Sequence, residues 1–140
     1  MADDVLLNKA ATIERCVARA REEYAAAGAN FHADYSRQDA AILNIQRACE
    51  AALDIAYHLI RAHKLGLPQS ARDAFDLLAQ ATLLDPPLAE AMKKMAGYRH
   101  IAVHNDQKLL LPITENIIQH HLDEFSQFTS VLIKQQSGLP

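Results

Sequence analysis

Apolar residues recur every three or four positions along most of the chain, which is the spacing of amphipathic helices. The first such segment runs from about Asp3 to Ala27 and stops at Gly28. The pattern predicts a heptad-like apolar seam along it, made of Leu6, Ala10, Ile13, Val17, Ala20 and Tyr24. Residues 28–35 are expected to form a loop or a connection that contains some helix.

A second and longer segment runs from near Ser36 to about Leu65, where Gly66 and Pro68 end it. It is the richest in alanine, so we expect it to lie at the centre of the fold. Its predicted apolar stripe consists of Ile42, Ile45, Cys49, Ala52, Leu53, Ala56, Leu59 and Ile60.

The middle of the chain contains two recognisable helix starts. Ser70 and Asp73 resemble a capping box with aspartate in place of glutamate, and they predict a short helix to about Ala81. The run Asp85-Pro86-Pro87 supplies a cap followed by prolines in the first turn, so a further helix should start there and reach about His104.

The last part of the chain is expected to form one helix. Residues 108–111 are interpreted as a connection, and Pro112 is expected to open a helix that runs to about Gln135. Its inward positions are Ile113, Ile117, Phe125, Phe128 and Leu132. Residues 137–140 should fray. Together the elements predict an all-α fold, an up-and-down bundle of four main helices plus one short helix, in a single domain over residues 1–140.

Composition and charge narrow the class of protein. A chain of 140 residues, half of them hydrophobic, suits one packed domain. No apolar run reaches the roughly 18–20 residues of a membrane span, and the acidic N-terminus is not a secretory signal. Cys16 and Cys49 are isolated, which indicates reduced core thiols and a cytoplasmic protein. A net charge of −3 argues against a protein that coats nucleic acid nonspecifically, but it leaves room for a local basic site.

The most informative stretch is residues 95–106, near the predicted end of a helix. One helical step beyond Leu88, Met92 and Met95 falls on Arg99, which therefore lies on the apolar stripe. A guanidinium is permanently charged and costly to desolvate without support. Its position therefore suggests a site.

Two histidines accompany this arginine. His100 and His104 are four residues apart and should lie on one flank of the helix. Cleavage of RNA through its own 2′-hydroxyl needs a general acid/base near neutral pH, for which His104 is suited. It also needs positive charge on the phosphate oxygens, which Arg99 can supply. Alternatively, Arg99 pairs with a carboxylate of a neighbouring helix, and His104 stabilises the C-terminal end of its own helix.

The segment from Met95 to His104 resembles the Arg-polar-x3-His motif of the HEPN superfamily, and within it the HepT-type toxins. Two further segments are similar to the second helix and the short mid-chain helix of that family, namely residues 46–56 and 74–78. The order of helices agrees as well. The resemblance extends over nearly the whole chain, although only the motif is specific.

The resemblance implies a homodimeric, metal-independent endoribonuclease toxin that needs no cofactor. Arg99 and His104 would be catalytic and His100 would support them, in a cleft where two subunits bring their motifs together. The implied antitoxin is an MntA-like nucleotidyltransferase that transfers AMP to a tyrosine two residues after the motif histidine. In this chain Asp106 stands at that position and has no phenol hydroxyl, and Tyr98 is the nearest tyrosine.

This departure leaves three possibilities open: inhibition by binding alone, modification of another residue, or no such partner. An aspartate beside His104 would also favour the imidazolium form and repel RNA phosphate. The alternative function is a non-catalytic helical binding partner, a substrate-binding subunit of a minimal nucleotidyltransferase. A zinc site built from His100 and His104 with Asp106 or the His120–His121 pair is a further alternative, without support from a cysteine or glutamate motif.

Overall fold

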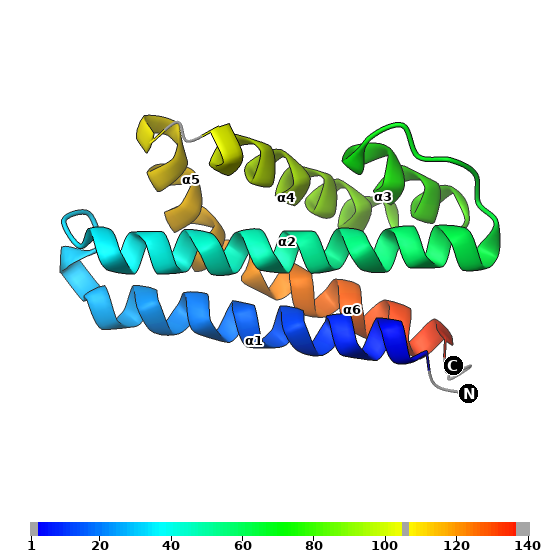
Figure 1. Cartoon of the computed structure of the whole chain (residues 1–140), viewed down its shortest axis with the longest axis horizontal. Coiled ribbons are helices and arrows are strands. Elements are labelled where there is room, and N and C mark those ends of the chain that lie inside the picture. The colour runs from blue at the N-terminus through cyan, green and yellow to red at the C-terminus, as the bar shows by residue number, and fades with distance from the viewer. Residues whose placement is uncertain (1–2, 105–106, 137–140) are drawn as a thin grey trace.

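The computed structural model describes residues 3–104 and 107–136, which are almost entirely helical (Figure 1). The elements in chain order are α1 (Asp4–Ala27), the 3₁₀-helix η1 (Gly28–Asn30), α2 (Tyr35–His63), α3 (Ala71–Gln80), α4 (Pro86–His104), α5 (Gln107–His120) and α6 (Leu122–Gln136). These ranges contain no strand, so the predicted all-α class is confirmed. None of these helices is long and apolar enough to cross a membrane.

Side-chain caps fix the starts of three helices close to the predicted positions. The Asp3 carboxylate accepts the Leu6 N–H at the start of α1. The Ser70 hydroxyl likewise accepts the Asp73 N–H at the start of α3. Asp34 caps α2 in the same way, so this helix begins at Tyr35, one residue before its predicted start at Ser36. Each cap satisfies a backbone donor that the first helical turn leaves free.

Helix α2 is the centre of the fold, as predicted. It runs alongside α1 in the opposite direction and contacts every other α-helix of the described chain (Figure 1). All eight residues of its predicted apolar stripe are buried. Burial of this stripe against α1, α4 and α6 removes much apolar surface from water, which is the main favourable term in folding.

The C-terminal part of the chain differs from the prediction of one helix opened by Pro112. Helix α5 already begins at Gln107, so residues 108–111 are helical and Pro112 lies inside the helix. A proline there removes one backbone hydrogen bond. The buried residues Leu110 and Thr114 hold the segment on both sides of the proline against the core. The expected fraying of residues 137–140 lies outside the described residues.

The predicted helix is also divided at His121, so the bundle has two helices, α5 and α6, where one was expected. The His121 carbonyl accepts the Glu124 N–H, and its ring Nδ1 contacts the Glu124 carboxylate. His121 and Glu124 thus contact each other through both backbone and side chain at the start of α6. The chain changes direction here, and α6 then runs beside α1 (Figure 1).

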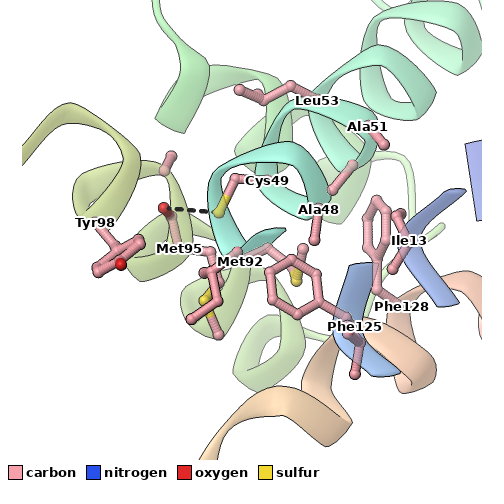
Figure 2. Packing of buried hydrophobic residues seen from close by; sticks show 14 of the residues in the cluster. Ile13, Ala48, Cys49, Ala51, Leu53, Met92, Met95, Tyr98, Phe125 and Phe128 are labelled. Carbon is pink, nitrogen blue, oxygen red and sulfur yellow. Dashed lines mark hydrogen bonds between the residues drawn. The ribbon is translucent and has the colours of Figure 1, made fainter. Parts of the chain in front are cut away.

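Aromatic and sulfur-containing side chains fill the core between α2, α4 and α6 (Figure 2). Phe75 and Phe128 meet edge to face with ring centroids 5.8 Å apart, a favoured arrangement of aromatic rings. The two cysteines are free and buried, which confirms their prediction as core thiols.

Candidate functional site

The candidate site lies at the C-terminal end of α4. The apolar stripe of this helix is buried at Met92 and Met95, and Arg99 continues it by one helical step. The guanidinium reaches the surface, with 39% of the side chain exposed, while its Nε atom is buried. The stem of Arg99 is therefore held in the protein, and its charged end is accessible.

The Nε atom of Arg99 has no hydrogen-bond partner among the described residues. Its nearest carboxylate oxygen is Oε1 of Glu50 on α2, at 3.7 Å, which is an ion pair but not a hydrogen bond. The alternative prediction is an arginine paired with a carboxylate of a neighbouring helix. Such a carboxylate is present, but it is too far from Nε for a hydrogen bond. A phosphate oxygen can reach the exposed end of this guanidinium, where the charge is only weakly neutralised by Glu50.

His100 and His104 contact each other, as their spacing predicts. Their ring centroids are 4.3 Å apart and the rings cross at 68°. Both side chains are exposed, and so is Val103 beside them, with 62% of its surface accessible. This flank of α4 is open, so a substrate or a second protein chain can reach the imidazoles.

Arg99 and His104 do not lie on the same face of α4. The helix continues through His104, so five helical positions separate the two residues by about 140° around the axis and about 7.5 Å along it. Arg99 lies toward Glu50 on α2, whereas His104 lies on the exposed flank with His100. A single chain thus presents the two groups on different sides.

Buried polar contacts hold α4 in place behind these residues. The Tyr98 hydroxyl is within 2.8 Å of Thr114 Oγ1, which donates in turn to the Leu110 carbonyl. The Cys49 thiol donates to the Met95 carbonyl at 3.4 Å (Figure 2). Burial raises the pKa of the Tyr98 phenol well above its usual value and raises the pKa of Cys49 to about 12. Both groups are therefore structural rather than reactive.

The structure also bears on the modification and metal hypotheses. Tyr98 is only 2% exposed, so this nearest tyrosine cannot accept a group from a partner protein in the folded chain. Asp106 lies outside the described residues. Within the described ranges, no group of three or more histidine, cysteine, aspartate or glutamate side chains could hold a metal ion. The His120–His121 pair lies at the junction of α5 and α6, where His121 contacts Glu124.

Glu50 is the one member of this site that the sequence reasoning missed. It lies in the segment of α2 that resembles the family, but a single exposed glutamate on a helix is usually only a solvated residue. Its role depends on α2 packing against α4, which no local spacing reveals.

Comparisons with known proteins identify relatives of this chain over most of its length. A family model described as "Ribonuclease HepT-like" matches residues 13–132. The mRNA nuclease HepT of Shewanella oneidensis is 49% identical over 130 residues, which cover 93% of this chain and 97% of the relative.

Two solved structures are similar to the whole fold. One is a tri-AMPylated Shewanella oneidensis HEPN toxin in complex with an MNT antitoxin, with a TM-score of 0.87 and 48% identity over 93% of this chain and 97% of that chain. The other is a toxin–antitoxin complex with AMP-PNP, with a TM-score of 0.87 and 48% identity over 93% and 98% of the two chains. With the family model and this level of identity, the chain belongs to the HepT-like family of ribonucleases.

Proposed function

We propose that this chain is the toxin of a toxin–antitoxin pair and cleaves RNA without a metal ion, with Arg99 and His104 as the catalytic residues. The observation that carries the proposal is the partly buried Arg99, whose charged end is accessible and whose contact with the Glu50 carboxylate is no shorter than 3.7 Å. The relative with 49% identity is an mRNA nuclease, which supports RNA as the substrate.

The chemistry follows from the two side chains. The RNA 2′-hydroxyl attacks the adjacent phosphorus, a new P–O bond forms, and the P–O bond to the next nucleotide breaks. An imidazole can take the proton from the attacking hydroxyl or give one to the leaving oxygen near neutral pH, which is the role of His104. Arg99 stabilises the negative charge that builds on the phosphate oxygens. His100, in contact with His104, keeps that ring in place.

The cleft is proposed to form between two copies of the chain. Arg99 and His104 lie about 140° apart on α4, so one copy does not bring them to the same phosphate. The exposed flank with His100, Val103 and His104 offers a surface that a second copy can cover. Two motifs placed face to face would bring the arginine of one copy near the histidine of the other.

The experiment that tests this function is an RNA-cleavage assay with EDTA present. Arg99→Ala is expected to lower kcat by about 10²- to 10³-fold, because it removes a donor that binds the developing charge. Arg99→Lys keeps the positive charge but loses the planar guanidinium, which can donate two parallel hydrogen bonds to a phosphate. An intermediate rate is therefore expected. Arg72→Ala, which removes an exposed arginine of α3, serves as the matched control.

Two results would contradict the proposal: equal rates for Arg99→Ala and the unaltered chain, or loss of cleavage in EDTA.

The absence of a tyrosine at position 106 favours a second candidate, a non-catalytic binding subunit of a nucleotidyltransferase. Growth arrest on expression of this chain alone separates the two, because only the nuclease is expected to be toxic.

The proposed antitoxin is an MntA-like nucleotidyltransferase, by analogy with the similar complexes. We expect it to bind this chain without leaving a stable AMP group. A carboxylate at Asp106 could form only a mixed anhydride with AMP, which water hydrolyses readily, and Tyr98 is buried. The measurement is the intact mass of this chain after co-expression with the partner. A mass increased by one or more AMP units would show that another residue accepts the group.

A further inference from the structure

A groove of about 620 Å³ lies along one side of the α1–α2 pair. Its charged lining consists of Lys9, Arg15, Arg19, Arg47, Glu50 and Asp54. The excess of cations there is local, since the chain as a whole carries a net charge of −3. An acidic protein that gathers arginines in one groove has a concentrated field for an anion.

Most charges at the ends of this groove are neutralised within the chain. Lys9 pairs with Asp54 at 3.0 Å at one end. Arg19 pairs with Glu22 and Glu23 at the other end. Between them, Arg15 and Arg47 form no ion pair with any carboxylate of the described ranges. The middle of the groove therefore carries two positive charges that are free to bind an anion.

These two arginines line the same groove although they belong to different helices. Arg15 is on α1 and Arg47 is on α2, and both line the groove together with Cys16. Burial, the larger effect, raises the pKa of Cys16, while the positive charges of both arginines oppose that rise. Because both arginines line the same groove, a single extended ligand lying along it can contact both.

Glu50 links the groove to Arg99, the proposed catalytic arginine. Glu50 lines the groove, and the carboxylate of this residue is 3.7 Å from Arg99 Nε. Arg47 precedes Glu50 by three residues on α2, which places it about 4.5 Å farther along the helix axis. A strand whose scissile phosphate contacts Arg99 could therefore extend past Glu50 toward Arg47 and Arg15.

We infer that this groove binds the backbone of single-stranded RNA next to the scissile bond, with Arg15 and Arg47 as contacts to flanking phosphates. The inference rests on the proposed nuclease function. Guanidinium groups bind phosphate through paired hydrogen bonds and read no base, so the groove would add affinity without sequence preference. It would give long RNA an advantage over very short RNA.

The binding experiment uses the full chain with His104→Ala, so that the RNA stays intact. Affinity for a fluorescent single-stranded RNA is measured against salt concentration. Arg15→Ala with Arg47→Ala is expected to flatten the slope of log affinity against log salt by about 1.4, because each phosphate contact contributes about 0.7. The matched control is Arg21→Ala with Arg61→Ala, which removes two exposed arginines of the same helices outside the groove and should leave the slope unchanged.

Cleavage by the active chain provides the second readout. The groove variant should raise KM for a long RNA and leave kcat unchanged. A short oligonucleotide that spans only the scissile bond should be cleaved as before. Replacing both arginines with lysine should restore the salt slope, because lysine keeps the positive charge.

The outcomes separate this inference from the proposed function. In one outcome, the unaltered chain and the groove variant show the same KM and the same slope of log RNA affinity against log salt. If the unaltered chain nevertheless binds and cleaves RNA, the inference is wrong and the proposed function stands. If the variant keeps the salt dependence of RNA binding but no longer binds the antitoxin or a second copy of the chain, the groove is a protein interface. The inference is again wrong in that case. If the unaltered chain neither binds nor cleaves RNA, both proposals fail.

Discussion

Replacing His104 with alanine should lower kcat for RNA cleavage by about 10²- to 10⁴-fold, the range that a positioned general acid or base contributes. The side chain is exposed, and its only described ring contact is with His100, so the fold should be unaffected. The measurement is single-turnover cleavage of a defined RNA, with circular dichroism as the check of folding. His120→Ala, which removes another exposed histidine, should cleave at the normal rate.

A mixture of two inactive variants tests where the two catalytic groups meet. If Arg99 of one copy works with His104 of the other, a dimer of Arg99→Ala and His104→Ala chains retains one intact pair and regains part of the activity. If both groups act within one copy, the mixture stays inactive. The separation of about 140° on α4 favours the first result.

The largest expected effect on stability comes from the core. Phe128→Ala should lower the free energy of unfolding by about 3–5 kcal/mol, because the ring is fully buried and packs edge to face on Phe75. The total free energy of unfolding of a domain of this size is only about 5–15 kcal/mol. Urea unfolding followed by circular dichroism measures the change, at one fixed protein concentration because assembly would add to stability.

Leu67→Ala is the control for that measurement. This leucine is 81% exposed, and its loss should change the free energy of unfolding by less than about 0.5 kcal/mol. An equal effect of the two substitutions would mean that the ring of Phe128 is not packed in the core.

The sequence predicted the helices best where a local signal marks their ends. Ser70 and Asp73 predicted the start of α3, and the structure confirms the cap between them. Gly28 marked the end of α1, where it adopts a left-handed φ of 55°. Such signals depend on residues within one helical turn, so they can be read without knowledge of the fold.

The predictions from sequence were wrong where the local preference of a residue and the burial of its neighbours favour different helix ends. Pro112 is typical of a helix start, yet the burial of Leu110 extends α5 to earlier residues. The division at His121 has no glycine or proline to mark it. It results from the contacts of His121 with Glu124 and from the packing of α6 along α1.

The sequence by itself determined the all-helical class, the apolar stripe of α2, and the position of Arg99 on a buried stripe beside two histidines. Each of these depends on residue type and on spacing within a helix, and a helix has a constant geometry. Only the tertiary structure decided that Glu50 faces Arg99 and that Arg15 and Arg47 share a groove. Those relations depend on how helices distant in sequence pack against one another, because side-chain shape across their whole contact sets the packing.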